Sequence, residues 1–580
     1  MSQHLLQIHI GPMQAFIAAA RRTRDLWFGS WLMSELSKAA ARGIAELAGE
    51  QSLIFPAATI ADLQPGTSLA VANKIVALVD DPTVAACQAK AALMERLTAL
   101  RQDALDGLER ALDTWETAVN QIDSLPEFYW VAVPLPNQAE YPRVRQEAEM
   151  LLAARKNCRQ FRQPSWGSNR PKSSLDGARE SVIPEKTAKD AQKMYGRFRA
   201  KAAEQLSGVD LLKRLGKATG HAYFPSTSHM ASMPLRISLE NADAATQLKV
   251  RTAWQKYLNT LTGPIKDGER TTDTHTVFGD ADGALLFASR LRDYYAGEEL
   301  KAQDKALAAF YEESELPQPL PYYAILMGDG DRMGETINSL GTHPAHRQFS
   351  GVLAQFASEA QEIVTQHGGT AVYTGGDDVL ALLPLHTALD CAKALADAFR
   401  TMMQTNNYDA TFSAGVAIFH HLEPLEDGLN EARRAEKAAK SVPGKNALAV
   451  VEAKRSGAPR LVKGKWGEVD KRLLAIGRFY QQDALPHGLA YQLREAYLRL
   501  GGETAVATDP ALHKVVRLEA GRLVKRKEGS EAAQTYMENE LVSLLGDNYS
   551  MEQLANELII ANSLAQTAEQ ANVLLSAEEA

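Results

Sequence analysis

The segment Thr370–Leu383 reads TAVYTGGDDVLALL. It predicts two short strands joined by a tight turn, because apolar and β-branched residues flank a Gly-Gly pair. Glycine suits such a turn because it reaches positive φ without steric cost. The turn also carries two adjacent carboxylates, Asp377 and Asp378, which repel one another unless a cation or solvent screens them. This hairpin therefore carries both a fold signal and a candidate chemical site.

Strand and helix patterns alternate on both sides of the hairpin. Tyr322–Met327 predicts a buried strand followed by a Gly-Asp-Gly-Asp turn, and Phe349–Gln366 predicts a helix. After the hairpin, Thr387–Thr405 predicts a helix, Ala410–Ile418 a strand and Leu425–Lys440 a further helix. The order up to the last strand is β-α-β-β-α-β, which is typical of the ferredoxin-like fold shared by palm domains.

The ferredoxin-like topology brings a third carboxylate near Asp377 and Asp378. The first strand neighbours the hairpin in a ferredoxin-like sheet, so Asp329 is expected to approach Asp377 and Asp378. Two Mg²⁺ ions, or Mn²⁺, would neutralise the three carboxylates and coordinate triphosphate oxygens. A nucleotide could come close to the backbone at Gly375 and Gly376. The tetrapeptide alone is better explained as an ordinary hairpin turn, in which Asp is a common residue. The spacing to Asp329 favours the metal site.

Two lysines follow at the end of the predicted unit. Lys440 stands in the last turn of a helix, and Lys445 stands in the loop after it, within Gly-Lys-Asn. Lysine ammonium groups bind phosphates as point charges. The pair therefore indicates a place for a triphosphate.

Length, charge and cysteines limit the class of protein. The 580 residues exceed what one hydrophobic core supports, so three or four domains are expected. The three cysteines are far apart and form no CxxC pair, which favours a reducing cytosol over a disulfide framework. The net charge of −8 disfavours a free-standing, non-specific nucleic-acid binder, although basic residues gather between Arg155 and Lys217.

The remaining sequence gives coarser predictions. Leu5–Ile10 and Phe128–Val133 predict strands, and Gln14–Ala41 predicts one long helix. His221–Met233 predicts a loop, and the chain beyond Lys465 predicts a helical bundle. No apolar run approaches the roughly 20 residues that span a bilayer.

Several of these segments resemble one known family. The block from Asp329 to Asn446 is similar to the palm of GGDEF-type diguanylate cyclases. It is more similar to the large, palm-containing subunit of type III CRISPR effector complexes, which carries Gly-Gly-Asp-Asp. Four further segments resemble that subunit in its Cmr (III-B) branch: Ile10–Trp27, Lys172–Ser181, Phe224–Ser228 and Leu485–Ala490.

The resemblance implies an α+β protein with two ferredoxin-like palms. The first palm is expected to be degenerate and to lack the metal carboxylates. Helical domains are expected between the palms and at the C-terminus. The implied divisions are a first palm with a helical insertion at 1–150, a loop-rich and helical linker at 151–316, the active palm at 317–455 and a helical domain at 456–580.

The resemblance also implies an activity in CRISPR antiviral defence. Such subunits, activated by target RNA within a crRNA-guided Cmr complex in the cytoplasm, convert ATP into cyclic oligoadenylates in a Mg²⁺-dependent reaction. The catalytic and metal-binding residues carried over are Asp329, Asp377 and Asp378. The nucleotide-binding positions carried over are Gly330, Gly375, Gly376, Lys440 and Lys445.

Two departures from the family shape further expectations. Many relatives have an HD-type nuclease domain, but the sequence contains no His-Asp dipeptide, so no DNase activity is expected. Ser173 and Ser207 stand where some relatives have cysteines, so no zinc is expected.

Three alternatives remain open at this point. The same complex could join ATP to S-adenosylmethionine, and a catalytically silent subunit could act only as a crRNA scaffold. A diguanylate cyclase is disfavoured because valine follows the two acids at Val379.

Overall fold

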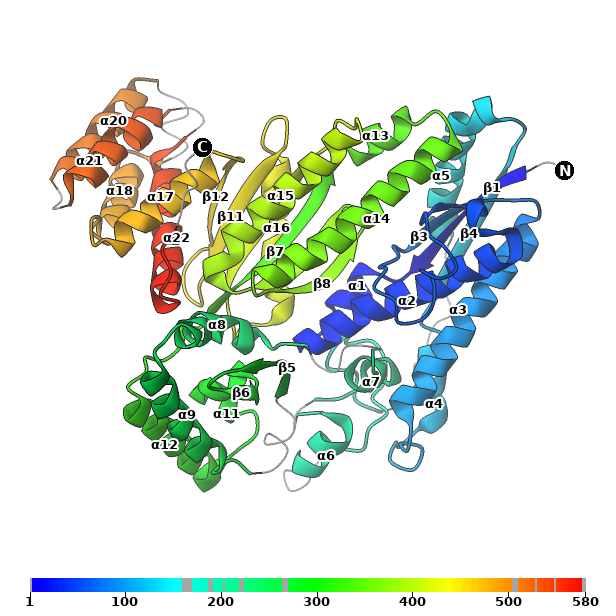
Figure 1. Ribbon diagram of the computed structural model, residues 1–580, viewed down its shortest axis with the longest axis horizontal. Coiled ribbons are helices and arrows are strands. Elements are labelled where there is room, and N and C mark those ends of the chain that lie inside the picture. Colours follow the sequence, from blue (N-terminus) through cyan, green and yellow to red (C-terminus); the bar gives the residue numbers. More distant parts are fainter. Residues whose placement is uncertain are drawn as a thin grey trace.

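A four-stranded antiparallel sheet forms the first unit of the computed structural model (Figure 1). Its strands lie in the ferredoxin-like order β2-β3-β1-β4, so the predicted first palm is confirmed. The strands are β1 (Gln3–Gly11), β2 (Leu53–Phe55), β3 (Lys74–Val79) and β4 (Glu127–Leu135). The helices are α1 (Gln14–Ala18), α2 (Thr23–Ala48), α3 (Pro82–Leu105), α4 (Trp115–Asp123) and α5 (Tyr141–Asn157).

A six-stranded sheet forms the second palm. Its strands are β7 (Tyr322–Asp331), β8 (Thr370–Gly375), β9 (Asp378–Leu383), β10 (Thr411–His420), β11 (Ala447–Ala453) and β12 (Arg460–Lys465). Their order, β12-β11-β10-β7-β9-β8, contains the same ferredoxin-like core with two added strands. Its helices are α13 (Met333–Ser339), α14 (His343–Gln366), α15 (Ala388–Thr405) and α16 (Leu425–Lys440).

The two faces of the second sheet are covered by different parts of the chain. Side chains alternate along β7, so Ala324 and Leu326 pack in the cluster that contains the apolar residues of α14 and α15. Tyr323 and Ile325 point the other way, into a cluster shared with α16 and the first palm. The second palm is therefore buried on both faces, and its site opens at the strand ends.

The two palms contact each other reciprocally. Helix α2 of the first palm packs against β8 of the second, and α14 of the second packs against β2 of the first. Polar contacts reinforce this interface: the Ala57 N–H donates to Ser350 Oγ at 3.0 Å, and Tyr141 Oη lies 2.6 Å from His346 Nδ1. The Arg347 guanidinium donates to the carbonyls of Glu50 and Leu53.

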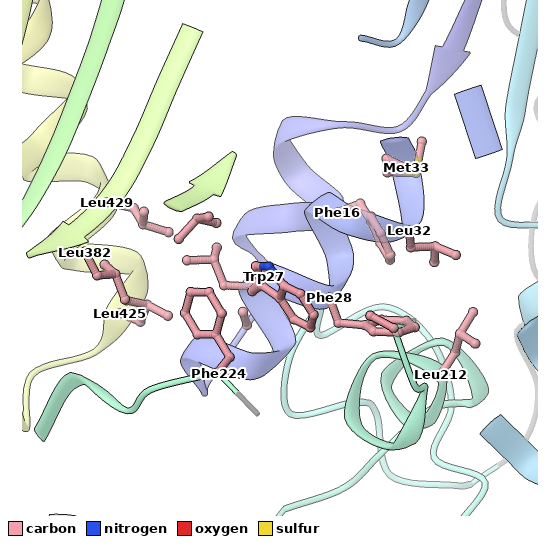
Figure 2. Packing of buried hydrophobic residues seen from close by; sticks show 14 of the residues in the cluster. Phe16, Trp27, Phe28, Leu32, Met33, Leu212, Phe224, Leu382, Leu425 and Leu429 are labelled. Carbon is pink, nitrogen blue, oxygen red and sulfur yellow. The ribbon is translucent and has the colours of Figure 1, made fainter. Parts of the chain in front are cut away.

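Aromatic side chains fill the space where α2 meets the second palm. Trp27 stacks on Phe224 with ring centroids 5.4 Å apart. Figure 2 shows both rings between α2 and side chains of the second palm, among them Leu382 and Leu425. Phe28 is fully buried on the same helix and faces the linker. These aromatic residues serve the core.

Helices predominate in the linker and at the C-terminus. In the linker they are α6 (Ala191–Phe198), α7 (Gly208–Leu215), α8 (Thr227–Glu240), α9 (Ala244–Leu258), α11 (Ala288–Leu291) and α12 (Gly297–Ser314), beside the short strands β5 (Arg270–His275) and β6 (Gly279–Ala281). At the C-terminus they are α17 (Val469–Gln481), α18 (Leu489–Arg499), α20 (Pro510–Lys525), α21 (Glu531–Tyr536) and α22 (Met551–Gln570). Helix α22 packs against α17 and β12.

The structure describes most of the chain. None of the helices within it combines the length and apolar character needed to cross a membrane. The domain divisions given above stay predictions. The described residues are 3–158, 169–185, 191–201, 204–218, 224–262, 270–502, 510–526, 529–546 and 549–575.

Three predictions of local structure were wrong. The expected turn at 328–331 continues β7 as far as Asp331, because these residues pair with β10. The single helix expected over Gln14–Ala41 breaks between α1 and α2. The described part of the loop expected over His221–Met233 becomes helical at Thr227, because Ser226 caps α8 through a 3.0 Å bond from the His229 N–H.

Candidate active site

The Gly-Gly-Asp-Asp turn is the tip of the β8–β9 hairpin. Gly375 pairs with Asp378 across the hairpin, so Gly376 and Asp377 form a two-residue turn. Gly376 has φ +70°, which only glycine adopts readily. Gly375 is required for a different reason, because a Cβ there would lie 2.1 Å from the hydroxyl of Tyr373. The two glycines thus fix the turn by backbone conformation and by space.

Asp377 lies over the end of β7. A Cβ added to Gly330 would stand 2.9 Å from the Cβ of Asp377, so the missing side chain at Gly330 leaves room for this carboxylate. Gly328 pairs with Val379 in the sheet, which places Asp329 and Asp378 one residue further along their strands. The structure therefore brings the hairpin carboxylates to the end of β7, as the topology predicts.

Asp329, the third carboxylate of the predicted metal site, is already ion-paired. Lys440, in the last turn of α16, makes an ion pair with Asp329 and a second one with Glu436 at 3.2 Å. Within the described residues, no three His, Cys, Asp or Glu side chains converge as a metal-binding set. The ammonium group of Lys440 instead supplies positive charge beside Asp329. Lys440 therefore lies at a carboxylate, which the sequence did not predict.

The carboxylates at the turn have raised pKa values, as expected of buried acids that lack a neutralising cation. Burial, followed by the charge of Asp378, raises the pKa of Asp377 to about 7. Burial also raises the pKa of Asp378, although its side chain is exposed on one side and water screens part of this effect. Glu436 shows a raised pKa for similar reasons, burial and the nearby Asp378. Carboxylates held in this way are stabilised by a bound cation.

These residues fit a divalent cation such as Mg²⁺. Oxygen ligands from carboxylates are those that Mg²⁺ prefers, and the two hairpin carboxylates supply them from one turn. The ion pair between Lys440 and Asp329 shows that a cation is accommodated beside the remaining carboxylate. Burial and the charge of Lys445 lower the pKa of Lys440 to about 8.

The second aspartate of the Asp-Gly-Asp motif has a structural role. Asp331 is fully buried and accepts hydrogen bonds from the hydroxyls of Thr411 at 2.8 Å and Ser413 at 2.9 Å. It also accepts from the Asn446 N–H at 3.0 Å. Asp331 thus ties β7 to β10 and to the loop that carries Lys445, and so fixes the position of that loop.

Helix α16 packs closely against β10 at Gly415. A Cβ at Gly415 would lie 2.1 Å from the backbone nitrogen of Glu436, so helix and strand are in backbone contact there. Gly415→Ala is expected to lower the free energy of unfolding by about 1–3 kcal/mol or more, since backbone must move. A urea titration measures this.

The matched control is Gly334→Ala on α13. A Cβ at Gly334 meets nothing within 4 Å, and alanine favours a helix. This variant is expected to keep or slightly raise the free energy of unfolding. Equal losses for Gly415→Ala and Gly334→Ala would contradict the close contact of α16 with β10.

The raised pKa of Asp377 predicts a pH dependence of the metal-free protein. Between about pH 4 and pH 7 the folded state keeps a proton that the unfolded state has released. The stabilisation is therefore complete below about pH 4 and is lost as the pH rises through about 7. Asp377→Asn is expected to abolish the decrease in unfolding free energy that Asp377 causes between about pH 4 and pH 7. Urea titrations in EDTA at several pH values measure this. An unchanged dependence of stability on pH in the variant would contradict the raised pKa of Asp377.

Sequence reasoning missed several polar residues of the site. Glu436 stands one turn before Lys440, and this i, i+4 spacing could have identified it. Tyr373 has its hydroxyl against Gly375 and was treated only as a strand residue. The alternation of Thr411 and Ser413 along β10 could have pointed to a shared buried partner.

The two serines at the expected cysteine positions lie in one polar cluster. Ser207 caps α7 and shares hydrogen bonds with Asp210, at 3.2 Å to its N–H and 2.8 Å to its carboxylate. Ser173 hydrogen-bonds the same carboxylate, whose pKa is raised by burial. The expectation that no zinc binds here stays a prediction.

A carboxylate-bearing hairpin on a ferredoxin-like sheet defines a palm domain of the nucleotidyltransferase-like class. Comparison with known families agrees: residues 322–449 match the family described as Cas10/Cmr2, second palm domain. Residues 5–122 match CRISPR-associated protein Cmr2, N-terminal. Both palms of the chain therefore match domains of the CRISPR-associated protein Cmr2.

One curated relative is the CRISPR system Cmr subunit Cmr2 of Pyrococcus furiosus. It is 35% identical over 188 residues, which make up 28% of this chain and 21% of that protein. The chain thus spans about a fifth of the length of that relative.

Two solved structures share the fold over nearly the whole chain. One is the Type III-B Cmr-beta complex in the apo state, with a TM-score of 0.64 and 14% identity over 98% of this chain and 82% of the other. The second is Cmr-beta bound to cognate target RNA, with a TM-score of 0.64 and 13% identity over 98% and 83%. The likeness at this identity concerns the fold.

Proposed function

We propose that the second palm is a Mg²⁺-dependent nucleotidyltransferase that converts ATP into cyclic oligoadenylates. The observation that carries this proposal is the pair Asp377 and Asp378 at the hairpin tip, lying against the end of β7 with pKa values raised by burial. The arrangement leaves two acidic groups that a divalent cation would stabilise, with two lysines beside them.

Different side chains of the second palm would bind the metal and the triphosphate. Asp377 and Asp378 would hold the metal, and Asp329 would join them by exchanging its ion pair with Lys440 for the cation. The bound metal would neutralise charge on phosphate oxygens and lower the pKa of an attacking 3′-hydroxyl. Lys440 and Lys445 would bind the triphosphate as point charges. The open backbone at Gly376, where a side chain would meet nothing, would let the nucleotide approach the turn.

A small cavity at the contact between the palms brings polar groups of both palms to the candidate turn. It has a volume of about 180 Å³ and is lined by the β2–β3 connection of the first palm, including Thr67 and Ser68. From the second palm it is lined by α14, including Ser358, and by Thr374 next to the Gly-Gly pair. Hydroxyl groups from both palms therefore lie beside the candidate turn.

We also propose that the activity is controlled by RNA within a Cmr complex. The fold matches a Cmr-beta chain over 98% of this chain, and one such structure is bound to cognate target RNA. The partners would be a crRNA, its target RNA and other Cmr subunits. The net charge of −8 is consistent with RNA being held by the assembly more than by this chain alone.

The direct test is product formation by the assembled complex. The complex is incubated with Mg²⁺ and ATP, with and without target RNA, and products are separated by chromatography and identified by mass. Cyclic oligoadenylates formed only with target RNA would support the proposal.

Parallel reactions distinguish the alternatives. A product that requires both ATP and S-adenosylmethionine would replace the oligoadenylate assignment, and a product from GTP alone would indicate a diguanylate cyclase. No product from any nucleotide would leave a scaffold role.

A further inference from the structure

A large cavity lies at the end of the second palm opposite the Gly-Gly-Asp-Asp turn. Strand β10 begins opposite Asp331 and ends opposite Tyr322, and His421 just beyond it lines the cavity. Ten residues of strand separate the two places by roughly 30 Å. The cavity is therefore distinct from the candidate active site.

Three parts of the chain build this cavity. The segment that leads into α2 supplies the first palm's wall, and the linker contributes residues such as Ser174 and Tyr294. The second palm contributes Glu423 from the loop before α16 and Leu425 from the start of that helix. The volume is about 640 Å³, within the range of small-molecule sites. An occupant would touch both palms and the linker at once.

Positive charge gathers in the cavity. Six of the lining side chains are cationic: Arg21, Arg22, Arg24, Arg199, Lys201 and Arg290. Of its four carboxylates, three are already ion-paired: Glu204 with Arg214, Asp293 with Lys201 and Glu423 with Arg455. The cavity therefore has an excess of positive charge for an anionic occupant.

The cations are crowded enough to repel one another. Burial, followed by the charge of Arg199, lowers the pKa of Arg24 to about 10. Arg24 donates to the carbonyls of Arg214 at 3.2 Å and Gly216 at 2.7 Å, which are neutral acceptors. Burial, together with Arg22 and Arg290, likewise lowers the pKa of Lys201. A bound anion would relieve this repulsion.

Two arginines at the cavity are available for a ligand. The side chains of Arg21 and Arg199 are exposed, and neither makes an ion pair or hydrogen bond with any other residue in the described ranges. Guanidinium groups bind phosphate through two parallel hydrogen bonds. Tyr294, half-buried in the wall, supplies aromatic surface for a base.

We propose that this cavity binds a nucleoside phosphate, either free or as a residue of an RNA strand. The cationic lining recognises the phosphate, and the volume and aromatic surface favour a nucleoside over a bare inorganic ion. Because its walls come from both palms and the linker, the occupied state stabilises their relative placement. Arg290 joins the linker to the second palm, since it donates to Thr227 Oγ1 at 3.0 Å and to the carbonyl of His421 at 2.9 Å.

The test measures binding by the full-length chain in EDTA, which suppresses metal-dependent binding at the palm turn. The probes are ADP, a fluorescein-labelled 5′-phosphorylated tetraadenylate RNA and inorganic pyrophosphate. Arg21→Glu combined with Arg199→Glu is expected to weaken binding of ADP or the RNA by about tenfold or more. The control, Arg110→Glu combined with Lys305→Glu, reverses two exposed cations outside the cavity and is expected to bind like the parent.

The outcomes separate the sources of the ligand. Binding of ADP alone identifies a free nucleotide, and binding of the RNA alone identifies a strand. The proposal is overturned if the parent binds neither probe, if the double variant binds like the parent, or if pyrophosphate binds as tightly as ADP. Because the readout is binding without metal, its failure leaves the proposed palm activity untouched.

Discussion

Replacing Asp377 and Asp378 together by asparagine is expected to reduce nucleotide turnover by about a thousandfold or more, on the order of 4 kcal/mol in the barrier. Asparagine keeps the size of both side chains, so the hairpin tip is expected to fold as before. What is lost is the negative charge that would hold the metal beside the end of β7. The measurement is product formation from ATP by the assembled complex with target RNA.

The matched control for this pair is Asp409→Asn. Asp409 lies in the same palm, and its side chain is 96% exposed, so its charge is screened by water. Turnover by this variant is expected to stay within about twofold of the parent. Undiminished turnover in the Asp377→Asn, Asp378→Asn variant would show that the chemistry occurs elsewhere.

Arg214→Ala is expected to lower the free energy of unfolding by about 3–5 kcal/mol. The guanidinium is fully buried and donates to both carboxylate oxygens of Asp25 at 2.7 Å and to Glu204 at 3.0 Å. Burial raises the pKa of the Glu204 carboxyl, but the charge and hydrogen bonds of Arg214, with smaller contributions from Arg22 and the Lys201 N–H, together lower it to about 2. Removal of Arg214 would leave two buried carboxylates without this partner. Urea titration followed by circular dichroism measures the loss.

Two comparisons show whether buried charge is the cause. Arg499→Ala breaks an ion pair with Glu495 whose side chains are 77% and 61% exposed, and it is expected to cost less than about 1 kcal/mol. Arg214→Met combined with Asp25→Asn and Glu204→Gln removes all three charges and is expected to recover much of the stability. If this triple variant were as unstable as Arg214→Ala, lost packing would be the better explanation.

The second palm could be predicted from sequence in considerable detail. The strand and helix periods between Tyr322 and Lys440 are regular, and glycines mark the hairpin, so element order and topology followed from local pattern. The turn expected at 328–331 failed because strand pairing with β10 overrides the turn preference of Gly and Asp.

The candidate site was predictable in part for similar reasons. Topology placed Asp329 near the hairpin, but the pairing of Lys440 with Asp329 depends on how closely α16 approaches β10. That distance is set by Gly415, whose role requires knowledge of the helix packed over it. The basic cavity joins residues more than 400 positions apart, such as Arg21 and Leu425, and no local pattern relates them.

The reciprocal packing of the two palms has a kinetic consequence. Since both palms belong to one chain, their interface forms as a unimolecular event at a high effective concentration. A nucleotide site shared between them would not need to be assembled by a collision between two copies of the protein. Diluting the protein should therefore leave its specific activity constant, as long as the surrounding complex stays intact.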